Sequence, residues 1–212
     1  MSATAKPNPL VLIVSGPSGS GKSTLVQKIL ELPGTMSSIS CTTRPRRSTE
    51  ARGKCYDFVT EAQFDAMVAR GEFLEFARVF DKHSYGTPRK WLDESRSSGL
   101  DLVLEIDVQG AAQVKEKLPE SVAIFILPPS RAELERRLRG RAQDSDEEIA
   151  RRLAKARDEI SAFSKYYDFC VVNDDVDRAG HEAQAIVTAL RCSSARRRPQ
   201  VEQLQATFGG RD

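Results

Sequence analysis

The sequence lacks any apolar run long enough to cross a membrane. Its longest uninterrupted runs, Leu10–Val14 and Val122–Leu127, fall far short of the roughly 20 residues that a membrane helix needs. The first residues, Met1–Pro7, also lack the charged segment followed by an apolar one that marks an export signal. We therefore expect a soluble, cytoplasmic protein with no membrane partner.

Cysteine and histidine are scarce. The chain has two histidines and four cysteines, which are Cys41, Cys55, Cys170 and Cys192. Because no two cysteines have the C-x-x-C spacing, a zinc site is disfavoured and reduced cytosolic thiols are expected. For Cys41, a reactive thiolate stabilised by Arg44 is an alternative to the packed thiol that we favour.

An excess of charge of one sign is absent as well. The 32 basic and 30 acidic residues leave a formal net charge of +2. This balance gives no electrostatic reason to expect a nucleic acid or a membrane surface as partner. The run Arg196–Arg198 belongs to a polar tail, 193–212, that we expect to be a frayed and solvated end.

What the sequence does contain is a phosphate-binding loop, G-x-x-x-x-G-K-[ST], at Gly16–Ser23. Its glycines let backbone N–H groups turn toward phosphate oxygens, Lys22 is expected to reach the β- and γ-phosphates, and the Ser23 hydroxyl is expected to ligate Mg²⁺. A helix that begins near Ser23 adds its positive end. The apolar run before the loop and the amphipathic run after it predict a buried strand and a helix. This pattern indicates a nucleotide-handling protein.

Strand-like and helix-like segments alternate along the chain, which is typical of an α/β fold with a parallel sheet flanked by helices. With 212 residues, of which 40% are hydrophobic, one globular domain suffices. Strands buried on both faces are predicted at Leu100–Ile106, Val122–Leu127 and Phe169–Val172. The segment from about 36 to 79 differs and is interpreted as an inserted subdomain. Its candidate strands lie around Ile39, at Tyr56–Val59 and at Phe73–Val79.

Capping chemistry predicts several helix starts. The capping box fits Thr60 with Gln63, Ser130 with Glu133 and Ser145 with Glu148, and Thr87 before Pro88 fits an N-cap followed by proline. The helices so predicted run over 61–70, 88–98, 131–139, 146–165 and 178–191. Plausible helix stops are Gly71, Gly99 and Gly140.

A phosphate loop alone does not identify the phosphoryl acceptor, and the inserted segment carries that information. Ser40–Arg47 places four hydroxyl or thiol groups beside three guanidinium groups. Such a cluster suits a second phosphate, since the planar fork of arginine engages phosphate oxygens in pairs. A solvated basic loop is the alternative for the isolated run Arg44–Arg47.

Further segments occur in a specific order along the chain. They are Thr42–Arg46, Gly71–Glu75, Tyr85–Thr87, Glu105–Gly110, Arg137–Arg141, Arg152–Leu153 and Val172–Asp175. Together with the loop Ser15–Thr24, they resemble the guanylate kinase family over nearly all of Leu10 to Leu190. The resemblance implies a P-loop kinase that phosphorylates GMP with ATP and Mg²⁺.

The resemblance also implies a domain organisation. A guanylate kinase-like domain would span 10–190, with its core at about 10–35, 88–140 and 166–190. A GMP-binding subdomain would occupy about 36–87, and a short helical lid about 141–165.

Carried over by resemblance, the GMP site consists of a phosphate group of residues, Arg44, Arg47, Tyr56 and Tyr85, and a guanine group of residues, Ser40, Glu75, Thr87 and Asp107. The choice of Glu75 makes physical sense. Guanine shows two N–H donors on its pairing edge where adenine has an acceptor and no amine, so a fixed carboxylate rewards one base and repels the other.

On the donor side, the resemblance assigns ATP to Gly16, Pro17, Ser18, Gly19, Ser20, Gly21, Lys22, Ser23, Thr24 and Asn173. The catalytic cations would be Lys22, Arg137, Arg141 and Arg152, and Ser23 would ligate the metal. Nearby Arg136, Arg139, Arg151 and Arg157 are expected to form surface ion pairs. Glu105 either orients the Mg²⁺ water shell or the loop lysine, or pairs structurally with an arginine.

Some loops depart from the family pattern, at 48–52, at Cys55 and at 81–84. Two alternatives to guanylate kinase stay open. One is a P-loop kinase for a different acceptor, and the other is a catalytically inactive module that binds phosphopeptides, against which the intact loop argues. The oligomeric state is not predicted.

Overall fold

The structure, a computed structural model, describes residues 8–46, 56–79, 83–140, 145–161, 163 and 166–208. Its larger sheet has five parallel strands in the order β2-β7-β1-β8-β9. The strands are β1 (Val11–Ser15), β2 (Thr35–Ser37), β7 (Asp101–Glu105), β8 (Val122–Leu127) and β9 (Phe169–Val172). The expected parallel α/β sheet is confirmed.

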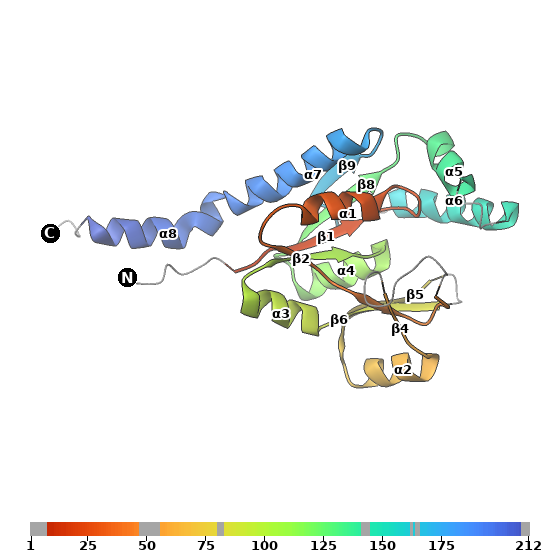
Figure 1. Cartoon of the computed structure of the whole chain (residues 1–212), viewed down its shortest axis with the longest axis horizontal. Coiled ribbons are helices and arrows are strands. Elements are labelled where there is room, and N and C mark those ends of the chain that lie inside the picture. Colours follow the sequence, from red (N-terminus) through yellow and green to blue (C-terminus); the bar gives the residue numbers. More distant parts are fainter. Residues whose placement is uncertain are drawn as a thin grey trace.

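Helices cover both faces of this sheet (Figure 1). One face packs against α1 (Lys22–Leu30) and α7 (Val176–Arg191), and the other against α3 (Lys90–Ser98) and α4 (Val108–Lys117). In the central strand, alternate residues enter the two apolar clusters, which explains its continuous apolar run. The edge strand β9 exposes three of its four residues, so the expectation of burial on both faces is wrong there.

A smaller sheet has four strands in the order β4-β3-β6-β5. The strands are β3 (Ser40–Thr42), β4 (Tyr56–Phe58), β5 (Phe73–Val79) and β6 (His83–Pro88). Helix α2 (Glu61–Ala69) packs on this sheet through Phe64, whose ring stacks on that of Phe73 at 4.6 Å. Cys41 is buried in the same cluster, and burial raises the pKa of its thiol to about 11. The prediction of a packed thiol is confirmed.

Two further helices, α5 (Arg131–Arg139) and α6 (Asp146–Ser161), pack against each other through Leu134, Leu138, Ile149 and Ala156. Thr60 and Gln63 form the full capping box that the sequence predicts for α2. Ser130 forms only half of one, because the Glu133 side chain binds arginines instead. The division into core, subdomain and lid stays a prediction.

Several elements differ from those predicted. Thr87 is not a helix cap, since it lies in β6 with its hydroxyl hydrogen-bonded to Glu75, and α3 begins later, at Lys90. Neither β6 nor α4 was among the predicted elements. The start of α4 is capped by the side chain of Asp107, which accepts from the backbone N–H of Gly110. An isolated aspartate that follows an apolar strand-like run gives a weak cap signal without a capping box.

The prediction of a frayed tail is also wrong over most of its length. Residues Ser194–Thr207 form α8, which projects away from the body of the molecule beyond α7 (Figure 1). Since the helix buries none of its residues, packing does not explain it. Its alanine, arginine and glutamine residues have a high intrinsic helix propensity, which does. Within the described residues, no helix combines the length and the apolar character needed to span a bilayer.

Candidate active site

The loop between β1 and α1 depends on glycine conformations. Gly16, Gly19 and Gly21 have φ angles of 140°, 93° and 94°, a region that side chains rarely adopt. A Cβ on Gly16 would lie 2.3 Å from the carbonyl oxygen of Ile126 on β8. Glycine is therefore required where the loop passes over the sheet, and such backbone geometry forms an anion-binding concavity.

The two polar side chains that follow the glycines reach opposite parts of the site. Lys22 Nζ donates to the carbonyl oxygens of Gly16 at 2.8 Å and Pro17 at 3.0 Å, so the ammonium lies across the loop. Ser23 Oγ donates to Glu105 Oε1 at 2.6 Å. Glu105, at the end of β7, thus lies beside the hydroxyl that the sequence assigns to Mg²⁺.

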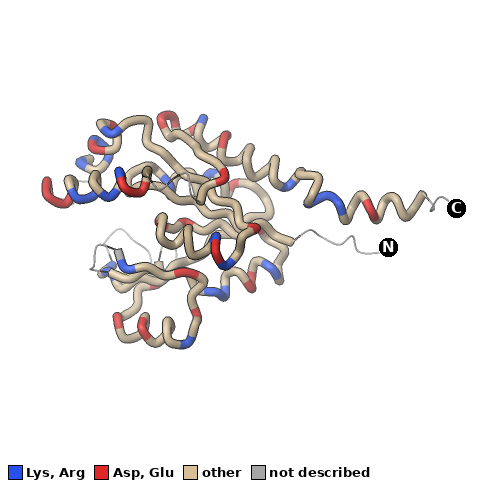
Figure 2. Tube along the Cα trace, turned by 180° about the vertical axis from the view of Figure 1, so that it is seen from behind, with Lys and Arg blue, Asp and Glu red and all other residues tan. Residues whose placement is uncertain are grey.

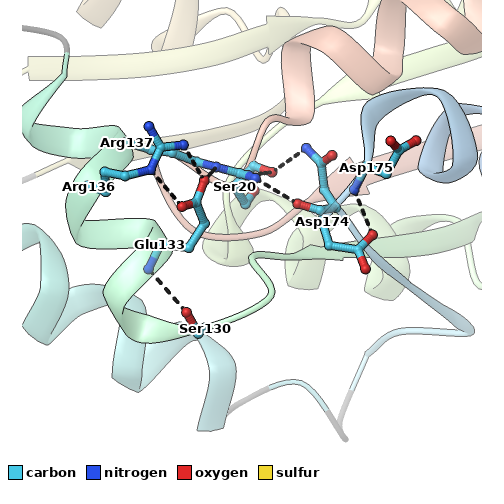
Figure 3. Close-up of polar contacts among 8 residues, drawn as sticks. Ser20, Ser130, Glu133, Arg136, Arg137, Asp174 and Asp175 are labelled. Carbon is cyan, nitrogen blue, oxygen red and sulfur yellow. Dashed lines mark hydrogen bonds and ion pairs between the residues drawn. The ribbon is translucent and has the colours of Figure 1, made fainter.

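The carbonyl group of Ser20 in the loop accepts hydrogen bonds from two side chains of other segments, Asn173 and Arg137 (Figure 3). Asn173 Nδ2 donates to this oxygen at 2.8 Å, and Arg137 Nη1 approaches it at 3.4 Å. Arg137 Nη2 also donates to the backbone oxygen of Asn173 at 2.8 Å. Asn173 is only 2% exposed, and a Cβ on Gly21 would lie 2.0 Å from its Nδ2. Asn173 and Arg137 therefore support the loop backbone.

Arg136 and Arg137 are neighbours with different surroundings. Both donate to Glu133, and these bonds, that of Arg136 first, hold the pKa of the Glu133 carboxyl at about 2 (Figure 3). The side chain of Arg136 is 74% exposed, against 22% for Arg137. Only Arg137 of this pair contacts the phosphate loop.

Helix α6 contributes a second arginine to the loop. Arg152 Nη1 donates to Ser18 Oγ at 3.0 Å. The expected surface ion pairs are confirmed for Arg136, Arg139, Arg151 and Arg157, which pair with Glu133, Glu135 and Asp146, Glu148, and Asp158 respectively. Basic and acidic residues accordingly lie close together along α5 and α6 (Figure 2). Arg141 lies outside the described residues.

A cleft of about 620 Å³ joins the phosphate loop, the smaller sheet and α6. Its lining includes most of the predicted site, namely Gly16, Ser18, Gly19, Gly21, Lys22, Ser23, Thr24, Ser40, Arg44, Tyr56, Glu75, Tyr85, Asp107 and Arg152. Of the described site residues, Pro17, Ser20, Thr87, Arg137 and Asn173 are not part of the lining. The structure thus brings the two groups of predicted residues to one cavity.

Three side chains from three strands of the smaller sheet form a buried polar chain. Thr87 Oγ1 donates to Glu75 Oε1 at 2.6 Å, and Ser40 Oγ lies 3.1 Å from Thr87 Oγ1. Glu75 is 4% exposed, and burial raises the pKa of its carboxyl to about 7, although the Thr87 bond opposes this shift. A Cβ on Gly110 would lie 2.5 Å from Glu75 Oε2. Glu75 is therefore a fixed carboxylate at the bottom of the cleft.

Aromatic rings surround the arginine on the same side of the cleft. The guanidinium carbon of Arg44 lies 5.6 Å from the ring centres of both Tyr56 and Phe58, within the range of cation–π attraction. Tyr56 and Tyr85 meet edge to face at 5.8 Å. One cation and two phenol groups thus face the cleft together. Arg47 lies outside the described residues.

Sequence reasoning missed several charged residues of the cleft, which are Glu148, Arg151, Lys155 and Glu159 on α6. Lys155 Nζ lies 3.4 Å from both Asp107 Oδ2 and Glu159 Oε1. A signal for these residues exists in the sequence. Lys155 and Glu159 follow Arg152 by three and seven positions, so a helix places all three on one face.

Comparison with known proteins agrees with this site. The family model described as guanylate kinase matches residues 7–190. Guanylate kinases of Myxococcus xanthus and Syntrophotalea carbinolica are 46% and 49% identical to the chain, over 98% and 94% of both partners. The solved guanylate kinase of Anaplasma phagocytophilum is 34% identical, with a TM-score of 0.81 over 98% of this chain and 99% of that one. The chain therefore belongs to the guanylate kinase family.

Proposed function

We propose that this protein transfers the γ-phosphoryl group of ATP to GMP, and also to dGMP, giving ADP and GDP. The reaction serves purine nucleotide metabolism and the recycling of GMP. The observation that carries the proposal is that a fixed, buried Glu75 and a phosphate loop open into one cleft. A base pocket and a triphosphate cradle in a single cavity support transfer between two nucleotides.

The donor half of the cleft binds ATP. The backbone of Gly16–Thr24 surrounds the phosphates, and Lys22 moves from the carbonyl groups that it now bonds to the β- and γ-phosphates. Arg137 and Asn173 keep the Ser20 carbonyl turned away from the cleft. Since the two ends of a peptide unit point in opposite directions, this contact turns the N–H of Gly21 toward the phosphates.

Ser23 and Glu105 suit a magnesium ion. A hydroxyl and a carboxylate at hydrogen-bond distance are the hard oxygen donors that Mg²⁺ prefers, directly or through water. When bound with ATP, the ion neutralises charge on the β- and γ-phosphates. Ser23 would ligate it, and Glu105 would hold its water shell.

The acceptor half binds GMP. Ser40, Glu75, Thr87 and Asp107 surround the guanine base, with the carboxylate of Glu75 accepting from its ring N–H and amine. Arg44, Tyr56 and Tyr85, joined by Arg47, hold the phosphate of GMP. A buried carboxylate facing the wrong base is left unpaired, which selects against AMP.

Phosphoryl transfer then needs little more than alignment and cations. The two nucleotides are held in line across the cleft, and charge that develops on the transferred group is balanced by Lys22 and Arg152, with Arg141 as a further cation. Arg137 contributes to catalysis by holding the loop backbone through Ser20. Arg152 already bonds the loop through Ser18. The lid helix, α6, helps to exclude water, which otherwise competes as acceptor.

The test is a coupled assay of ADP formation with Mg-ATP and, in turn, GMP, dGMP, AMP, UMP and CMP. We expect turnover with GMP and dGMP, and kcat/KM for AMP lower by at least about 100-fold. K22M, assayed beside the wild type, excludes a contaminating kinase, because it should lose the activity while keeping its circular dichroism spectrum. No turnover with GMP, or a preference for AMP, would refute the proposal.

A further inference from the structure

Lys155 lies in the cleft without a part in the function proposed above. It belongs to α6 and its side chain is 26% exposed. Its Nζ lies 3.4 Å from Asp107 Oδ2 and 3.4 Å from Glu159 Oε1. Lys155 is therefore held between a carboxylate of its own helix and one that comes from the end of the large sheet.

Asp107 is fixed from two sides. Its Oδ1 accepts from the backbone N–H of Gly110 at 3.0 Å and caps α4. Its Oδ2 faces Lys155, so each carboxylate oxygen has a different partner. The hydrogen bond from Gly110 alone would let the Asp107 carboxylate turn about Oδ1. The contact with Lys155 fixes the direction of Oδ2 as well.

The same face of α6 also reaches the donor half of the cleft. One turn before Lys155, Arg152 Nη1 donates to Ser18 Oγ of the phosphate loop at 3.0 Å. The helix thus contacts the loop through one cation and the guanine side through the next. Glu159, one turn further, is 9% exposed and holds Lys155 from the other side.

We propose that Lys155 is a positioning residue for guanine recognition: from the lid helix α6, it orients the Asp107 carboxylate toward the base. The inference rests on the proposed binding of GMP, with Asp107 contacting guanine. The contact between α6 and Asp107 is then coupled to the binding of the acceptor, GMP. Because linkage between sites is reciprocal, GMP favours the docked helix, and the docked helix favours GMP.

The experiment compares wild type, K155M, K155R, D107N and the double variant K155M/D107N. For K155M we expect the KM for GMP to rise roughly tenfold, which is within the range of coupling between two residues in contact. The values of kcat and of the KM for ATP should stay within about twofold of wild type. K155R keeps the charge and should restore most of the affinity. R157M is the matched control, since Arg157 is on the same helix, is 79% exposed and pairs with Asp158.

Two further measurements separate positioning from other roles. Guanosine, which has no phosphate, should inhibit K155M more weakly than wild type by the same factor as GMP, because Lys155 acts on the base through Asp107. In the D107N background, K155M should change the KM for GMP by less than about twofold, because the two residues act as one unit. Thermal unfolding of each variant checks that the fold is kept.

Three results would overturn the inference: an unchanged KM for GMP in K155M, unchanged inhibition by guanosine with weakened GMP, or additive effects of K155M and D107N. The second would show that Lys155 acts on the phosphate. A wild type that fails to turn over GMP refutes the proposed function itself and this inference with it. Normal wild-type turnover with an unaltered K155M refutes only the role of Lys155.

Discussion

The two halves of the cleft use different chemical groups, backbone in one half and side chains in the other. The phosphate loop is one continuous segment whose shape depends on backbone conformations at Gly16, Gly19 and Gly21. The proposed base pocket takes Ser40, Thr87 and Glu75 from three strands, β3, β6 and β5, and depends on side chains. A phosphate is the same in every nucleotide, so backbone N–H groups suffice to bind it. A base differs between nucleotides, and only side chains of chosen chemistry can distinguish it.

The difference between backbone and side-chain groups also determines which substitutions each half of the cleft tolerates. In the loop, an added methyl group meets backbone at Gly16, leucine side chains at Gly19 and a buried amide at Gly21. In the base pocket, an isosteric replacement keeps the shape and changes only the pattern of donors and acceptors. We therefore expect shape changes to damage the donor half and chemical changes to damage the acceptor half.

The largest effect is expected for G21A. The methyl group would lie 2.0 Å from Asn173 Nδ2, at a φ of 94°, so either the loop or the Asn173 amide that holds it must shift. Since the backbone donors then lose their alignment, kcat/KM for ATP should fall by roughly 10³-fold, comparable to the loss of an oxyanion donor. The control is G99A, because Gly99 has a similar φ of 70° and nothing within 4 Å. G99A should lose about 1 kcal/mol of stability and no activity. Equal loss of activity in both variants would assign the effect to strain.

The acceptor half is tested by a change of chemistry at constant shape, E75Q. An amide in place of the carboxylate turns an N–H group toward a guanine donor. The ratio of kcat/KM for GMP to that for AMP should fall by roughly 100-fold, while the KM for ATP stays near the wild-type value. E72Q is the control, since Glu72 is an exposed carboxylate just before β5 that pairs with Arg70. Unchanged selectivity in E75Q would mean that another group reads the base.

The support behind the loop is tested by a matched pair, R137M and R136M. Both remove a partner of Glu133, but only Arg137 contacts Ser20 and Asn173. We expect kcat to fall by roughly 100-fold for R137M and by less than about twofold for R136M, because a Ser20 carbonyl without this support no longer keeps the backbone donors of the loop aligned. Single-turnover kinetics with GMP measure this step. Similar losses in the two variants would show that Glu133, rather than the loop contact, carries the effect.

The smallest expected effect is a dependence of stability on pH. The backbone amides of the loop do not titrate, whereas the Glu75 carboxyl does. Burial raises the pKa of the Glu75 carboxyl to about 7, whereas the unfolded chain keeps its ordinary pKa of about 4.3. Between these values the folded protein holds a proton that the unfolded chain has lost, so this group makes the free energy of unfolding fall as the pH rises toward 7 and level off above it. The slope is at most about 1.4 kcal/mol per pH unit.

Urea unfolding of the wild type and E75Q over this pH range measures the contribution. The difference in stability, wild type minus E75Q, should become steadily more negative up to about pH 7 and then stay constant. Parallel profiles would contradict a raised pKa. Binding of guanosine should show the opposite trend, because the ionised carboxylate is the form that accepts its N–H groups.

The contrast between the halves also explains what the sequence could predict. The loop, β1 and α1 are one contiguous pattern, and the capping box of Thr60 and Gln63 is local chemistry, so both were predicted correctly. Thr87 was assigned to a helix cap because its proline neighbour satisfied the local rule. A hydrogen bond to Glu75, twelve residues away in sequence, overrides that rule in the fold.

Side-chain direction was the other limit. Six arginines lie on α5 and the first half of α6. Composition could not indicate that Arg137 and Arg152 turn toward the loop while Arg136, Arg139 and Arg151 pair with carboxylates of their own helix. Lys155 belongs to no motif, so only its spacing from Arg152 on one face of a helix indicates it. In the tail, polarity does not by itself indicate disorder, because α8 needs no buried face to be helical.

Gly110 has no functional group, yet it limits the depth of the base pocket. A Cβ on Gly110 would lie 2.5 Å from Glu75 Oε2, closer than a side-chain carbon can approach. Any larger residue there would force either the Glu75 carboxylate or the start of α4 to move. In the proposed mode of guanine binding, the position of the group that reads the base therefore depends on the backbone of α4, where glycine has a hydrogen atom and every other amino acid has a carbon.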